Sequence, residues 1–183
     1  MKKVAAHAVL AGVIALLGLQ VCAQSLAPEL RVVLPAATLS GQATMTFWGF
    51  EVYKAGLWAA PGLSAAQYHQ TPFALSLTYL RSLQGSEIAK RSIAEMRRQG
   101  PMTAQEESAW EDQMRTLFPN VNAGDNLTGV HLPGRGAEFW SGGRKLGEVR
   151  DVAFSQRFFG IWLSPQTSEP ALRLALLAGA TPP

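Results

Sequence analysis

Two aromatic-rich blocks constrain the fold of this chain more than any other feature. The first, residues 47–58, reads Phe-Trp-Gly-Phe-Glu-Val-Tyr-Lys-Ala-Gly-Leu-Trp, and the second, residues 158–163, reads Phe-Phe-Gly-Ile-Trp-Leu. Because aromatic and β-branched residues favour strands, residues 44–60 are predicted to form one strand, or two strands that meet near Gly49. Phe158 and Trp162 lie four residues apart, which predicts a helix with a bulky apolar wall.

The N-terminus has the pattern of a secretory signal peptide. Lys2 and Lys3 precede an apolar run over residues 4–19, and Val-Cys-Ala at residues 21–23 is a plausible cleavage site. We therefore predict a signal peptide at residues 1–23, a single domain at residues 24–183, and a location in the bacterial periplasm or outside the cell. A retained membrane anchor and a lipid attached to Cys22 are the alternatives, although the apolar run is shorter than the roughly 20 residues that a spanning helix needs.

Composition excludes several classes of function. The chain has 16 basic and 13 acidic residues, and removing Lys2 and Lys3 leaves 14 basic residues, a balance that does not predict nucleic-acid binding. Cleavage after Ala23 also removes Cys22, the single cysteine, and with it disulfides and thiolate chemistry. No cofactor or metal motif is present, so we predict a protein without a cofactor or metal. Cleavage of the leader would also leave no stable membrane span.

The rest of the chain alternates groups of strands with groups of helices. Residues 73–81 alternate so that Tyr79 and Arg81 continue an otherwise apolar strand face. Helices are predicted at residues 86–99, with Ser86 as N-cap, and after Thr103, which forms a capping box with Glu106. Three short strands over residues 126–149 and two further helices, around residues 154–162 and 168–178, complete an α+β pattern.

A lipophilic ligand with a carboxylate or phenolate head would need an apolar cleft and a few fixed donors. The candidates for these donors are Tyr53, Tyr79, Arg81 and Arg91. The alternative is structural: the tyrosines are core residues bonded to backbone, Arg81 caps a strand end and Arg91 faces water. His69 and His131, the two histidines after the predicted leader, are interpreted as ordinary surface or turn residues.

The order of several motifs from Leu39 to Gly179 resembles the chalcone isomerase-like superfamily, in particular its bacterial secreted branch. The shared motifs are Leu-x-Gly, Val-Tyr-x-Ala-Gly-Leu, Gly124-Asp125, a glycine-rich hairpin, Ile-Trp-Leu and a closing Leu-Leu. The resemblance implies an antiparallel sheet with helices packed on one face and a ligand cleft between them. The superfamily also includes plant chalcone isomerase and plastid fatty-acid-binding relatives.

The resemblance places Tyr53 where the plastid fatty-acid-binding relatives have a tyrosine that holds a carboxylate with an arginine. The strand that would carry the arginine, residues 41–46, has no basic residue. Ile88, Arg91 and Glu95 stand where the enzyme has tyrosine, lysine and asparagine, so the donors that stabilise the enzyme's developing anion are replaced. The expectation is a non-catalytic, exported binding protein for a small lipophilic ligand such as a fatty acid.

Two other functions stay open at this stage. One is an isomerase or intramolecular lyase of chalcone isomerase type that acts on another substrate with Arg91 and Tyr53. The other is an envelope interaction module whose cleft is filled by five aromatic side chains, namely Phe47, Phe50, Phe154, Phe158 and Trp162.

Overall fold

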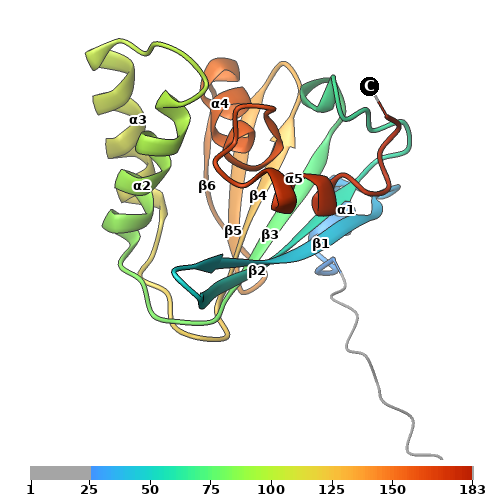
Figure 1. Ribbon diagram of the computed structural model, residues 1–183, viewed down its shortest axis with the longest axis horizontal. Coiled ribbons are helices and arrows are strands. Elements are labelled where there is room, and N and C mark those ends of the chain that lie inside the picture. Colours follow the sequence, from blue (N-terminus) through green and yellow to red (C-terminus); the bar gives the residue numbers. More distant parts are fainter. Residues whose placement is uncertain (1–25, 183) are drawn as a thin grey trace, which may run out of the picture.

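The computed structural model describes residues 26–182 (Figure 1). The signal peptide predicted at residues 1–23 lies outside the described residues. The helices and strands are α1 (Leu30–Val33), β1 (Thr38–Phe47), β2 (Phe50–Ala59), a 3₁₀ turn (Tyr68–Gln70), β3 (Phe73–Tyr79), α2 (Gly85–Arg97), α3 (Ala104–Leu117), β4 (Asn126–Leu132), β5 (Gly136–Ser141), β6 (Arg144–Val149), α4 (Val152–Leu163) and α5 (Pro170–Leu176).

The strands form a six-stranded sheet in the order β1 to β6, in which each strand pairs antiparallel with its neighbour in the sequence. The aromatic block at residues 47–58 contains the turn between β1 and β2. Trp48 and Gly49 form that turn and both have positive φ, 50° and 79°. The segment is thus two strands, because a two-residue turn of this kind matches the twist of a hairpin.

One face of the sheet packs against helices. Along β3, Phe73, Leu75, Leu77 and Tyr79 belong to a core that also includes side chains of α2, α3, α4 and α5. Figure 1 shows these helices on the same side of the sheet, with α2 and α3 as an adjacent pair. The α+β fold with helices packed on one face of an antiparallel sheet is therefore confirmed.

The opposite face of the sheet carries a smaller apolar cluster. Ala74, which alternates with Phe73 and Leu75 along β3, packs there with Trp58 and Val130 against Leu30 of α1. The short helix α1 has no counterpart among the predicted helices, since four residues are too few to produce a helical periodicity.

The ends of the helices show where local sequence signals hold. The capping box of Thr103 and Glu106 is present at the start of α3. The N-cap predicted at Ser86 is wrong: α2 begins at Gly85 with Gln84 as N-cap. The amide of Gly85 donates to the side chain of Asn120 over 3.0 Å, so a distant segment satisfies the helix terminus.

Candidate functional site

A cavity of about 370 Å³ lies between the sheet and the helices. Tyr53, Leu77 and Tyr79 line it from β2 and β3, and side chains of α2 and α4 line it from the other side. Its wall is predominantly apolar, and its volume falls within the range of small-molecule sites, roughly 300–1,000 Å³. The four residues proposed from the sequence, Tyr53, Tyr79, Arg81 and Arg91, all line this one cavity.

Tyr53 is held at the cavity by a hydrogen bond from α4. The indole Nε1 of Trp162 donates to the hydroxyl oxygen of Tyr53 over 2.9 Å. Burial raises the pKa of the Tyr53 hydroxyl to about 12, and the bond from Trp162 opposes this only in part. The phenol is therefore protonated at neutral pH, and with its oxygen accepting from Trp162, its own proton is available to an acceptor in the cavity.

Tyr79 lies next to Tyr53 on the neighbouring strand. The two residues are paired in the β2–β3 register, and their rings meet edge to face with centroids 6.1 Å apart. Burial raises the pKa of the Tyr79 hydroxyl, and the neighbouring Tyr53 raises it further. No hydrogen bond of the Tyr79 hydroxyl is found within residues 26–182. The cavity thus has two neutral phenol donors side by side on its sheet wall.

The two arginines differ in their partners. Arg91 of α2 forms an ion pair with Glu95 over 2.6 Å, and its side chain is 59% exposed. The guanidinium of Arg81 lies over the ring of Phe50, 5.2 Å from its centroid, and no carboxylate of the described residues lies within ion-pair distance of it. Arg81 is therefore the better placed of the two to neutralise a bound anion.

The helix α2 presents the residues that the resemblance aligned with enzyme positions. Ile88, Arg91 and Glu95 all line the cavity. On the opposite wall, β1 contributes Met45 and Phe47 and contains no basic residue. The arginine expected on that strand in an enzyme is thus absent from the cavity wall that β1 forms.

The aromatic side chains that were considered as fillers leave the cavity open. Phe154, Phe158 and Trp162 are buried in the core, where Phe154 and Phe158 stack with centroids 5.5 Å apart. Phe47 and Phe50 are exposed instead. The interpretation in which these five residues fill the cleft is therefore wrong.

Sequence reasoning missed two features of the cavity. It assigned Trp162 to the helix wall but not to the hydrogen bond with Tyr53, which joins residues 109 positions apart. It also missed that Glu87 and Glu169 line the cavity, whereas Glu95 was already aligned with a site position of the enzyme. The four-residue spacing of Phe158 and Trp162 was the available signal, since it places both side chains on one face of α4.

His131 corrects an expectation from the sequence. It is not a surface residue but lies in the core, 1% exposed, stacked on Phe73 with centroids 4.9 Å apart. Its Nε2 lies 2.8 Å from the carbonyl oxygen of His69, and its Nδ1 lies 2.7 Å from the hydroxyl of Ser155. Burial lowers the pKa of His131, more than its bond to the His69 carbonyl raises it. His131 is a partnered structural residue outside the cavity.

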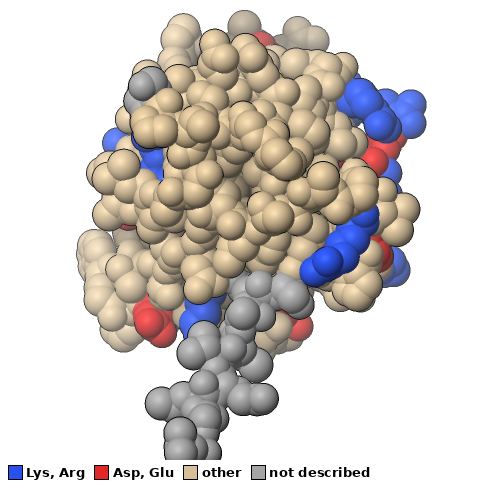
Figure 2. Space-filling model, turned by 90° about the vertical axis from the view of Figure 1, so that its right-hand side faces the viewer, with Lys and Arg blue, Asp and Glu red and all other residues tan. Residues whose placement is uncertain are grey.

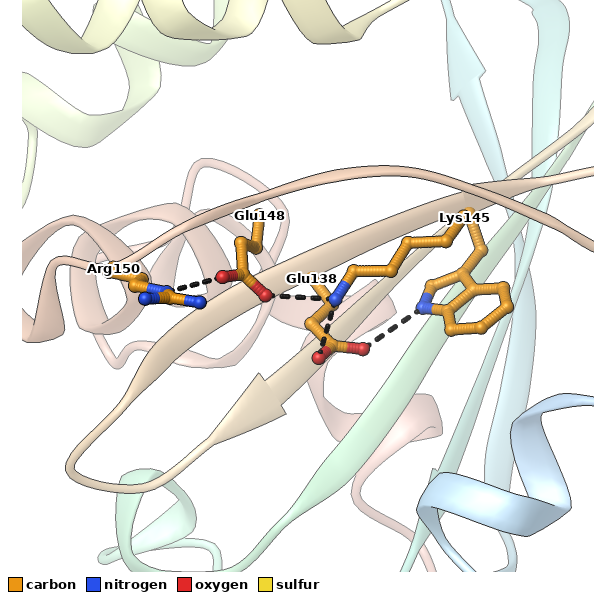
Figure 3. A network of polar contacts seen from close by, with 5 residues as sticks. Glu138, Lys145, Glu148 and Arg150 are labelled. Atoms are coloured by element: carbon orange, nitrogen blue, oxygen red, sulfur yellow. Dashed lines mark hydrogen bonds and ion pairs between the residues drawn. The ribbon is translucent and has the colours of Figure 1, made fainter.

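A second polar cluster connects β5 and β6 (Figure 3). Lys145 donates to Glu138 over 2.9 Å and to Glu148 over 2.8 Å, and Glu148 also pairs with Arg150. The indole of Trp140 donates to Glu138 over 3.3 Å. Each charged side chain in this cluster has a partner of opposite charge, whereas Arg81 has no such partner among the described residues.

Two further features concern residues 26–182. No group of three or more histidine, cysteine, aspartate and glutamate side chains is arranged to hold a metal ion there. None of the helices described is both long and apolar enough to cross a membrane.

Comparison with known proteins agrees with the fold. A family described as chalcone isomerase-like matches residues 20–178. An uncharacterized protein of Haemophilus influenzae is 31% identical over 137 residues, which span 75% of this chain and 66% of that protein. The crystal structure of a fatty-acid-binding protein of Arabidopsis thaliana has the same fold, with a TM-score of 0.60 and 12% identity over 78% of this chain and 87% of that one. The chain belongs to the chalcone isomerase-like family.

Proposed function

We propose that this protein is a non-catalytic binding protein that holds a small lipophilic molecule, such as a fatty acid, in the cavity between sheet and helices. The observation that carries the proposal is the pair of neutral phenols, Tyr53 and Tyr79, on the wall of a largely apolar cavity of about 370 Å³. The plant relative of the same fold is a fatty-acid-binding protein, which supports a lipophilic ligand.

The polar head of the ligand is proposed to lie against the two tyrosines and Arg81. A carboxylate buried without partners would be unstable, because desolvation costs several kcal/mol. Tyr53 and Tyr79 would each donate one hydrogen bond, and the guanidinium of Arg81 would supply the compensating charge. Arg91 contributes less, since Glu95 already neutralises it.

A fluorescent fatty acid provides the test of this function. Delipidated protein is titrated with the probe, and native mass spectrometry of gently purified protein reports any ligand that co-purifies. We expect saturable binding at one site. Tyr53→Phe should weaken it, whereas Tyr68→Phe, which removes the hydroxyl of a tyrosine outside the cavity wall, should leave it unchanged. Absence of saturable binding to the delipidated protein would contradict the proposal.

The alternative is an isomerase or intramolecular lyase. It is favoured by the position of Arg91, a cation that lines the cavity where the plant enzyme has lysine. However, Ile88 lines the cavity at the position of the enzyme's tyrosine and cannot donate a proton. We expect no cyclisation of a chalcone panel above the rate in buffer, and an accelerated reaction that is lost in Tyr53→Phe would favour the alternative.

We also propose that the protein is exported by means of a cleaved signal peptide at residues 1–23. The basic start, the apolar run and the small residues before Gln24 support this. N-terminal sequencing of protein recovered from a periplasmic extract tests it. A first residue of Gln24 is expected, and an intact Met1 in the membrane fraction would indicate a retained anchor.

A further inference from the structure

The hairpin of β1 and β2 ends in three large aromatic side chains that face solvent. Phe47 is 47% exposed, Trp48 is 87% exposed and Phe50 is 61% exposed. The rings of Phe47 and Trp48 stack with centroids 5.7 Å apart. We call Phe47, Trp48 and Phe50 the aromatic tip. Single exposed apolar residues are common on the surfaces of soluble proteins and need no explanation. A cluster of exposed aromatic residues is less common and indicates an interaction surface.

The turn chemistry indicates that Trp48 does not serve the stability of the fold. Its φ of 50° lies in the left-handed region, where a bulky residue is strained and where hairpin turns favour glycine, asparagine or aspartate. At 87% exposure, Trp48 also buries little surface in return. A residue that costs stability on both counts fits a role in contact with a partner.

The charges around the tip suit an interface between water and lipid. Residues 32–50 contain no charged side chain, so the tip itself carries none, and Glu51 directly after it would have to stay in the headgroup layer. Behind it, Arg81 lies over Phe50 and Arg91 lies over Phe47, with 5.2 and 5.7 Å from guanidinium carbon to ring centroid. Glu87 lines the cavity together with Arg81, but no ion pair of Arg81 is found among residues 26–182.

The tip borders the cavity. Phe47 belongs to the tip, Arg81 and Arg91 lie over rings of the tip, and all three residues line the cavity. In Figure 1 the hairpin, in teal, projects past the sheet on the side of α2. A surface that receives the tip would therefore lie next to the cavity.

We propose that the aromatic tip docks this protein on a lipid bilayer, with Phe47, Trp48 and Phe50 in the interfacial layer and Arg81 against anionic phospholipid headgroups. Tryptophan is enriched at membrane interfaces, since its ring is apolar and its N–H can bond to headgroups and water. Basic residues next to it add attraction to anionic lipid. This docking does not require a bound ligand. If the proposed function holds, a lipophilic molecule would pass between the bilayer and the cavity without crossing water.

Vesicle co-sedimentation tests the proposal with the full chain. Vesicles of phosphatidylcholine alone are compared with vesicles of phosphatidylcholine and phosphatidylglycerol. Trp48→Asn is the informative variant, because asparagine tolerates positive φ and the turn should stay intact. We expect its partition to vesicles to fall at least tenfold. Arg81→Gln should lose most of the preference for phosphatidylglycerol and keep binding to phosphatidylcholine.

A second surface poor in charge provides the control. Figure 2 shows that the side of the molecule at the right of Figure 1 has few charged side chains over its centre. Val32 on α1 is 84% exposed, which matches Trp48, and α1 packs on the face of the sheet opposite the cavity. Val32→Gln should therefore bind vesicles like the unchanged protein. All proteins are compared with the same N-terminus, so a difference in vesicle binding comes from the substitution.

Three results would overturn the proposal: equal vesicle binding by the unchanged protein and Trp48→Asn, no vesicle binding by either, or loss of binding in Val32→Gln alone. A dimer that dissociates in Trp48→Asn, with vesicle binding unaffected, would assign the tip to a second copy of the chain instead. Fatty-acid titration of Trp48→Asn in solution separates this proposal from the function, because Trp48 does not line the cavity and probe affinity should be unchanged.

Discussion

Trp162 donates its indole N–H to the hydroxyl oxygen of Tyr53 over 2.9 Å and so joins α4 to β2 across the cavity. The bond connects the two aromatic blocks of the sequence and fixes the rotation of the Tyr53 hydroxyl. It leaves the phenol proton as the free donor at the cavity wall. The same bond therefore supports both the packing of α4 and the chemistry proposed for the site.

Tyr53→Phe should destabilise the protein by about 1–3 kcal/mol, because the mostly buried indole N–H of Trp162 loses its acceptor. Urea unfolding measures this change. A double-mutant cycle with Trp162→Phe should show that the two changes are not additive, since each removes the same bond. Tyr68→Phe is the control, as its hydroxyl has no hydrogen-bond partner within residues 26–182. Additive effects of Tyr53→Phe and Trp162→Phe would mean that the bond contributes little.

Arg81 and Arg91 should differ in their effect on ligand binding. Arg81→Gln is expected to weaken binding of a fluorescent fatty acid about tenfold, which corresponds to losing one charge-assisted hydrogen bond of about 1.4 kcal/mol. Arg91→Gln should have a smaller effect, because the Arg91 charge is already paired with Glu95. Titration of both variants under the same salt conditions decides between them. A larger loss in Arg91→Gln would place the carboxylate at α2.

Stability should fall as the pH decreases below about 6.5, in part because of His131. Burial lowers the pKa of this residue in the folded protein, so between the folded value and about 6.5 the unfolded state binds more protons. Stability therefore rises with pH through this window. Urea midpoints measured from pH 5 to pH 8 test the effect. In His131→Gln the slope should become smaller, and an unchanged slope would assign the dependence to other groups.

Adjacent residues of β1 should respond in opposite directions to alanine. The hydroxyl of Ser40 is buried without a hydrogen-bond partner among the described residues, so Ser40→Ala should stabilise the protein by about 1 kcal/mol. A Cβ on Gly41 would lie 2.0 Å from the carbonyl oxygen of Ala175, so Gly41→Ala should destabilise it by about 1–3 kcal/mol as α5 is displaced. Thermal unfolding of both variants checks the signs, and a stabilised Gly41→Ala would contradict the close packing of α5 on β1.

Local signals in the sequence predicted much of the fold. The alternation of Phe73, Leu75, Leu77 and Tyr79 identified β3 and its buried face, and the Thr103 and Glu106 pair identified the start of α3. Turn glycines correctly separated β4, β5 and β6. These features depend on residues close together in the chain, and their periodicity reports burial directly.

The features that the sequence did not predict depend on contacts between distant residues. His131 was interpreted as a surface residue, yet Ser155 and the backbone of His69 satisfy both its ring nitrogens in the core. The start of α2 was misplaced because Asn120, 35 positions away, caps it. The four candidate site residues were all placed on one cavity, but the pairing of Arg91 with Glu95 and the freedom of Arg81 could be seen only in three dimensions.

The most direct test of the account is whether filling the cavity abolishes ligand binding without unfolding the protein. Ile161 lines the cavity and is only partly buried, so Ile161→Trp should fill space near Trp162 with limited strain. Delipidated protein and this variant are titrated with a fluorescent fatty acid, and circular dichroism confirms that both are folded. The account predicts saturable binding by the unchanged protein and none by folded Ile161→Trp, whereas equal binding by the two proteins would contradict it.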